Sequence, residues 1–330
     1  MFALTLSASF LLPPAPPPRE KAETAAAAIR KALPLLVQAA EGHAEQKTCF
    51  ACHNQAFPMM AFAAAKARGI DISASVFKGQ TDHIAAFIAS NRDKFKKGEG
   101  TGGQVDSAGY AMLTLELGGY KPDENTEAVV EYLLKTQAER DHWKTVSHRP
   151  PSEASDFTAT YLALRGLRYW GTKEQKDRGS KRIEAARGWL IQTKAKDTED
   201  RASRLFALKE AGAEEKEMAA AAWELLKTQR ADGGWSQLAA METDAYATGS
   251  ALVALHQAGG LPTDSPAYHR GIAFLVKTQQ TDGSWLIHSR SKPFQPYYES
   301  GFPHGTDQFI SAATSGWATT ALVLGSRNSR

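Results

Sequence analysis

Apolar positions along most of the chain recur with the spacing of helices. Between residues 24 and 41 they include Ile29, Leu33, Leu36 and Val37, which fall on one face of a helix. No alternating pattern of useful length appears, although alternation is what a half-buried strand produces. The pattern therefore predicts an all-α protein.

The predicted helices come in pairs that repeat along the chain. The first helix of a pair is richer in Glu, Lys and Arg and ends in Lys-Thr-Gln before a tight Asp-Gly-x-Trp turn, most clearly at 223–235 and 272–285. The second is apolar nearly all round and rich in Ala, Gly and Thr, as at 156–167 and 244–255. Six pairs are predicted: 24–69, 80–120, 125–171, 180–213, 215–260 and 267–325. Helices that are apolar on all sides are buried, so the second helices should form the inner barrel of a closed ring and the first helices its outer layer.

Particular residues mark the expected boundaries and packing of these pairs. The inner helices should begin near five residues: Asp106, Asp156, Asp200, Asp244 and Ser315. Trp143, Trp235 and Trp285 follow tight turns, and we expect them to pack between successive pairs and to stiffen the ring.

These repeats resemble those of a known group of proteins. The Lys-Thr-Gln-x-x-Asp-Gly-x-Trp segments at 227–235 and 277–285 look like the Gln–Trp repeats of the terpenoid cyclase and protein prenyltransferase β-subunit families. The Asp-x-x-Ala-Thr segments at 156–160 and 244–248 look like the inner helices of those families. The resemblance covers roughly residues 80–325 and implies an (α/α)6 toroid.

The resemblance does not extend to a complete catalytic motif. Squalene–hopene-type cyclases start cationic cyclisation with an Asp-x-Asp-Asp acid, and the nearest match is Asp197-Thr-Glu-Asp200, in which one position differs. Prenyltransferases bind zinc through Asp, Cys and His on inner helices, whereas both cysteines here lie elsewhere. The Cys-Gly-x-Gln thioester of complement-type toroids is also absent. Whether the chain is an enzyme stays open at this stage.

The strongest chemical motif is Cys49-Phe-Ala-Cys52-His53, the attachment signature of c-type haem. Two thiols three positions apart can bond both vinyl groups of one haem, and His53 would then be the proximal iron ligand. A thioredoxin-type pair would need a βαβ context. A zinc or other metal site, with His43 nearby, and incidental cysteines are the remaining alternatives. We therefore expect one covalent haem c at Cys49 and Cys52.

The motif lies where the other pairs carry their tight turn, so the haem would face the end of the barrel at which the inner helices begin. Four residues are candidates for the second axial position of the iron, with His148 first: His148, His304, Met59 and Met60. Open coordination is the other possibility. Three residues are candidates for the cavity: Asp156, Asp244 and Tyr161. Both aspartates also suit a simpler role as helix caps.

Composition and the first residues bear on partners and location. The chain has 330 residues and a net charge of only +3, which argues against a nucleic-acid binder, and no apolar run is long enough for a membrane span. Residues 1–23 read as an apolar, Pro-rich tail or a residual signal segment, followed by a single toroid at 24–330. The positively charged start of a secretory signal is missing. Export, to the periplasm for example, is the expectation.

Together these features predict an extracytoplasmic single-haem c-type cytochrome on a toroid. It would transfer electrons or carry out haem redox chemistry at the cavity mouth, with a redox partner protein or a small apolar molecule. One alternative is a cyclase- or prenyltransferase-like enzyme that acts on an apolar substrate in the central cavity. The other is a non-catalytic haem sensor or scaffold.

Overall fold

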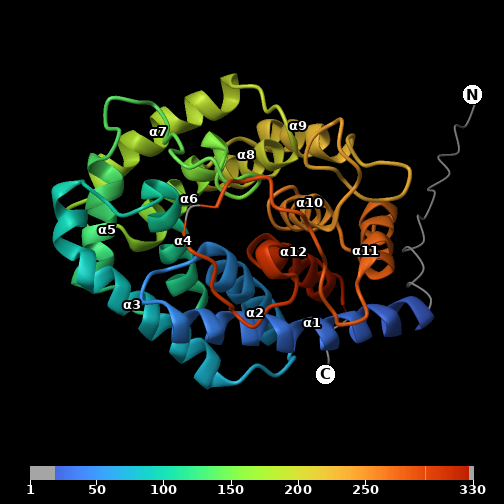
Figure 1. Ribbon diagram of the computed structural model, residues 1–330. Helices are drawn as coiled ribbons and strands as arrows, with labels where there is room; N and C mark the ends of the chain where they lie inside the picture. Colours follow the sequence, from blue (N-terminus) through green and yellow to red (C-terminus); the bar gives the residue numbers. More distant parts are fainter. Residues whose placement is uncertain (1–18, 294, 327–330) are drawn as a thin grey trace, which may run out of the picture.

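The helices form two concentric layers around one axis (Figure 1). The computed structural model describes residues 19–293 and 295–326, which contain twelve α-helices and no strand. The outer helices are α1 (Arg19–Gln46), α3 (Ala74–Lys97), α5 (Glu124–Lys135), α7 (Lys176–Gln192), α9 (Glu215–Leu226) and α11 (Pro266–Thr278). The inner helices are α2 (Phe57–Ala67), α4 (Gln104–Leu117), α6 (Asp156–Trp170), α8 (Thr198–Glu210), α10 (Ala245–Gln257) and α12 (Gln308–Gly325). The predicted all-α (α/α)6 toroid is confirmed.

The ring closes between its first and last pairs. Each inner helix packs on the next, and α12 packs on α2. In the outer layer, the Gln279 side chain donates a hydrogen bond to the carbonyl of Ala28 in α1 at 2.9 Å. Residues 1–18, which make up most of the predicted N-terminal tail, lie outside the described residues, and α1 begins at Arg19, before the predicted boundary at residue 24.

The Asp-Gly-x-Trp turns join the two layers. The indole N–H of Trp235 donates to the carbonyl of Leu225 at 3.0 Å, and its backbone N–H donates to the hydroxyl of Thr248 in α10 at 2.9 Å. Trp143 and Trp285 make the equivalent bonds. All three indoles are buried, so their role is structural, but these bonds join the two helices of one pair, whereas packing between successive pairs was expected.

Small residues allow the inner helices to approach closely. A Cβ added to Gly316 of α12 would lie 2.7 Å from the backbone of Phe57 in α2. Helix α12 begins at Gln308, seven residues before the predicted Ser315. The reason is that the buried Gln308 side chain accepts from the backbone N–H of Ser300 and donates to the carbonyl of Tyr298. A polar residue that is satisfied in this way conceals a helix start in the sequence.

Candidate functional site

The N-terminal ends of the inner helices meet at one end of the barrel, which we call the mouth. Residues 286–304, apart from 294, run across it in Figure 1. This segment bonds to both sides of the ring, because Arg290 donates to Gln237 at 3.0 Å and Tyr298 donates to His43 at 2.6 Å. The positive ends of several helix dipoles therefore meet at the mouth. The side chains beneath the crossing segment lie close to them.

Glu199, in the first turn of α8, is the most perturbed carboxyl group at the mouth. Its side chain is buried and accepts a hydrogen bond from the Thr158 hydroxyl of α6 at 2.8 Å. The Ser203 hydroxyl lies 3.5 Å from the same oxygen. Burial raises the pKa of Glu199 to about 8, and the negative charge of Asp197 adds to this. Glu199 is therefore a neutral carboxylic acid at pH 7, which can give up a proton.

The local sequence explains why Glu199 points inward. Asp197 caps α8 by accepting from the backbone N–H of Asp200 at 2.9 Å, and the Thr198 hydroxyl donates to the carbonyl of Ser236. Asp200 accepts from the hydroxyl of Ser155 at 2.7 Å. The side chains of Asp197, Thr198 and Asp200 are thus bonded to the backbone or to a neighbouring loop, whereas Glu199 bonds to Thr158 of the adjacent inner helix.

Beneath Glu199 lies a cluster of rings, which we call the aromatic cluster. Each inner helix contributes one ring: Phe57, Tyr110, Tyr161, Phe206, Tyr246 and Trp317. Ring centroids are 5.3 Å apart for Phe57 and Tyr110, 5.5 Å for Phe57 and Trp317, and 5.0 Å for Tyr161 and Phe206. Tyr246 lies close enough to Glu199 for the two groups to alter each other's pKa. The acid therefore faces an interior lined by π surfaces.

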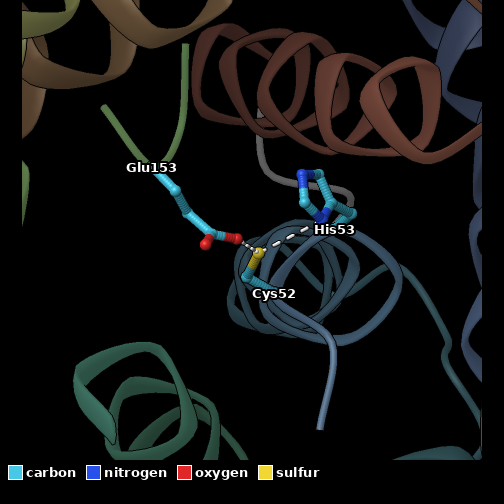
Figure 2. Close-up of side chains that lie close together, drawn as sticks. All are labelled: Cys52, His53 and Glu153. Atoms are coloured by element: carbon cyan, nitrogen blue, oxygen red, sulfur yellow. Dashed lines mark hydrogen bonds between the residues drawn. The ribbon is translucent and has the colours of Figure 1, made fainter. Parts of the chain in front are cut away.

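A second group of side chains meets at the mouth, and Figure 2 shows how they lie. The Cys52 thiol donates to a carboxylate oxygen (Oε1) of Glu153 at 2.8 Å. The His53 ring nitrogen Nδ1 is 3.2 Å from the same sulfur. Burial, and then the negative charge of Glu153, raise the pKa of Cys52 well above its ordinary value, so the sulfur is protonated here. Cys52, His53 and Glu153 form the only cluster in the described part of the chain whose His, Cys, Asp and Glu side chains could hold a metal ion.

Glu153 belongs to the connection between α5 and α6, which packs onto the Cys-x-x-Cys-His motif. Its backbone pairs with Arg149 through two bonds of 3.0 Å, and their side chains form an ion pair. Ser152 in the same loop places its hydroxyl 3.4 Å from Nε2 of His53, the nitrogen that would hold haem iron. Attachment of haem would therefore require this loop to move away from His53. Covalent haem c stays a prediction.

The two cysteines occupy different environments. Cys52 is buried, whereas Cys49 is exposed. The carbonyl of Cys49 accepts from Nε2 of His43 at 2.7 Å, and burial lowers the pKa of His43 to about 4. The motif is thus fixed at its first residue by a neutral histidine and at its fourth by Glu153.

The four candidates for a second iron ligand lie in different environments. His148 is exposed, and His304 lies in the last turn, where Nε2 is 2.7 Å from the hydroxyl of Ser284. Met59 is buried beside Gly118, at the C-terminal end of α4, and Met60 is half-buried. The cluster of Cys52, His53 and Glu153 includes neither His148 nor His304.

Of the three cavity candidates, one faces the interior. Tyr161 belongs to the aromatic cluster, and burial raises its pKa. Asp244 caps α10 by accepting from the backbone N–H of Ala247 at 2.9 Å, and burial raises its pKa to about 6. Asp156 accepts from the backbone N–H of Thr145 at 3.0 Å. Asp244 thus caps its helix, as the sequence also allowed, whereas Ser155 caps α6 and Asp156 instead fixes the loop before it.

Sequence reasoning assigned no functional role to three acids of the mouth: Glu199, Glu153 and Asp106. Glu199 stands at the altered position of the Asp-x-Asp-Asp-like segment, and that segment was the available signal. Asp106 of α4 is buried, which raises its pKa to about 7, and it accepts from the Thr145 hydroxyl at 2.6 Å. Glu153 belongs to no recognisable sequence motif. It meets Cys52 only in the fold, across a separation of 101 residues.

Comparisons with known proteins agree with this architecture. The family model for the squalene-hopene cyclase C-terminal domain matches residues 200–311. A structure of the type II terpene cyclase MstE from Scytonema with geranylgeranyl dihydroxybenzoate is similar with a TM-score of 0.59 and 14% identity, over 93% of this chain and 98% of that one. A protein from Actinoplanes is similar with a TM-score of 0.59 and 13% identity, over 91% and 99%. No curated protein matches the chain.

These findings correct the function expected from the haem motif. The matched family and a terpene cyclase among the similar structures point to a terpene cyclase-like protein, and none of them supports a haem cytochrome that transfers electrons. The predicted cytochrome is therefore wrong, and the redox partner that depended on it falls with it. No helix in the described residues is long and apolar enough to cross a membrane. The chain shares the toroid fold of type II terpene cyclases, and the cyclase-like alternative fits the comparisons better.

Proposed function

We propose that the protein acts like a type II terpene cyclase, with Glu199 as the acid that protonates a polyprenyl chain. The observation that carries the proposal is the position of Glu199: a buried carboxyl with a pKa of about 8 that faces the aromatic cluster. Its place in Asp197-Thr-Glu-Asp200 supports the proposal, because the Asp-x-Asp-Asp acid of squalene–hopene-type cyclases occupies such a segment. The change from Asp to Glu keeps a carboxylic acid there.

The chemistry would need only a proton and an apolar enclosure. The O–H bond of Glu199 breaks as its proton forms a C–H bond with one carbon of a terminal C=C bond, whose π electrons supply the pair. The resulting carbocation is attacked by the next C=C bond, which forms a ring C–C bond and moves the charge along the chain. The last cation loses a proton to water, which gives the neutral product, and Glu199 takes up one proton from water at the mouth, so that no net proton is consumed.

The surrounding side chains suit each step. Thr158 and Ser203 hold the Glu199 carboxyl in one orientation. Rings such as Trp317 and Phe57 present π faces that attract a cation within about 6 Å. The Oη of the neighbouring Tyr246 stays protonated, because burial raises its pKa well above the ordinary value. Glu199 is thus a protonated carboxyl group held beside the aromatic cluster.

The interior must open to admit such a substrate. A pocket of about 60 Å³ reaches Glu199 from the mouth, between Pro151, Leu238 and Arg290. That volume equals roughly two water molecules. Entry of a polyprenyl chain therefore requires the segment that carries Arg290 to move away from the mouth, or the rings of the aromatic cluster to separate.

The test is turnover of defined polyprenyl substrates. MstE was crystallised with geranylgeranyl dihydroxybenzoate, so this compound and squalene are suitable probes. In D2O the product should carry one deuterium from the initiating acid. Glu199→Gln should lower the rate by about 100-fold or more, the contribution of a general acid. Glu199→Asp should retain part of it, and the exposed Glu215→Gln serves as the control. Full activity in Glu199→Gln, or no cyclised product from any polyprenyl tried, would count against the proposal.

A further inference from the structure

We propose that Cys52, His53 and Glu153 bind a Zn²⁺ ion at the mouth, independently of the acid Glu199. Each residue offers one ligand atom, and the three atoms lie within 4.8 Å of one another. They come from the π-helical turn Cys52–Ala56, which leads into α2, and from the loop before α6, so an ion would link two segments that are 101 residues apart in the sequence. Figure 2 shows the three side chains converging.

The distances suit an ion at the centre of the three atoms. Zinc bonds of about 2.3 Å to sulfur and about 2.0 Å to nitrogen or oxygen place tetrahedral ligands about 3.5 Å apart. The Cys52 sulfur is already 2.8 Å from Oε1 of Glu153 and 3.2 Å from Nδ1 of His53. Side-chain movements of less than about 1 Å would therefore complete the geometry. The ion would replace the proton that the thiol now shares with the carboxylate.

A supporting shell for these ligands is already present. Nε2 of His53 lies 3.4 Å from the Ser152 hydroxyl, which fits a metal on Nδ1 and a proton on Nε2. Arg149 forms an ion pair with Glu153 and thereby orients its carboxylate. Metal ligands in proteins are commonly oriented by such outer contacts.

Charge and ligand chemistry select the ion. Thiolate and imidazole favour Zn²⁺ over Mg²⁺ or Ca²⁺, which prefer oxygen ligands alone. Binding would release the Cys52 proton, so that a thiolate and the Glu153 carboxylate face the ion. Three protein ligands leave a fourth position open to water or to a polar group of a substrate.

Zinc and haem make different demands on Cys49. Covalent haem uses both thiols, whereas Cys49 is exposed and lies outside the three-residue cluster. Cys49→Ser is therefore a matched control: it should leave zinc binding unchanged and would impair haem attachment. This difference separates the two occupants within one set of variants.

The experiment uses the full chain, freed of metal by a chelator and titrated with Zn²⁺ and Co²⁺. We expect about one ion per chain, a thiolate-to-cobalt charge-transfer absorption, and a rise in Tm on addition of zinc. Cys52→Ser and Glu153→Gln should lower the zinc affinity at least about 100-fold, and circular dichroism shows whether they fold. Cys49→Ser should bind like the unmodified chain.

Three results would overturn the proposal. The first is the absence of stoichiometric zinc binding by the unmodified chain. The second is unchanged affinity in a folded Cys52→Ser variant. The third is a haem mass attached to Cys49 and Cys52 after expression with haem-maturation machinery, because both thiols would then be consumed.

Discussion

Replacing Glu199 by glutamine should make the protein less sensitive to rising pH. Glu199 has a pKa of about 8 in the folded chain because it is buried, against an ordinary value of 4.5 that applies once the chain unfolds. Between these values the folded state binds more protons than the unfolded state. The free energy of unfolding therefore falls as pH rises through this window, and glutamine removes that loss because it does not titrate.

The magnitude follows from the two pKa values. Below pH 4.5 both states are protonated and Glu199 contributes no pH dependence. From about pH 5 to about pH 7, one group with these pKa values lowers the free energy of unfolding by about 2–3 kcal/mol. Asp106 and Asp244 also have raised pKa values, but both are present in each protein, so their contributions cancel in the difference.

The assay is urea unfolding, followed by circular dichroism, of the unmodified chain and Glu199→Gln at several pH values between 5 and 8. As pH rises from 5 to 7, the free energy of unfolding of the variant should increase relative to that of the unmodified protein by about 2–3 kcal/mol. Glu215→Gln, at an exposed position, should show no such gain. Parallel stability curves for Glu199→Gln and the unmodified chain would mean that Glu199 titrates normally, and would remove the basis for its role as a neutral acid.

Two further predictions concern the ring itself. Gly316→Ala should lower the free energy of unfolding by about 1–3 kcal/mol in urea denaturation, because the added Cβ would lie 2.7 Å from the backbone of Phe57. Gly188→Ala in α7 is the control, because its Cβ would meet nothing within 4 Å, and it should be neutral or stabilising in the same measurement. Trp235→Phe removes the donor to the carbonyl of Leu225 and should cost about 1–3 kcal/mol of unfolding free energy; a loss within error would contradict the role given to the turn.

The architecture could be predicted from the sequence because each helix pair is specified by residues within that pair. Trp235 and Trp285 stand ten residues after the carbonyls that accept their indole protons, so the same local segment recreates the same bond in each pair. Helix periodicity and the small residues of the inner helices then define the layers. The predicted start of α12 was wrong because the helix begins at Gln308, whose buried side chain bonds to Ser300 and Tyr298 in the segment before the helix.

The site was harder to predict because its chemistry comes from burial rather than from residue type. In the sequence Glu199 is one acid among many, and an exposed glutamate is an anion at pH 7. Only the closed ring removes it from water and places it against Thr158 and Tyr246, from neighbouring inner helices. The motif around Cys52 shows the converse. Its spacing suggested haem, yet its thiol contacts Glu153, a residue 101 positions away that no local pattern connects to it. A motif identifies which atoms can react, whereas the fold decides which partners they meet.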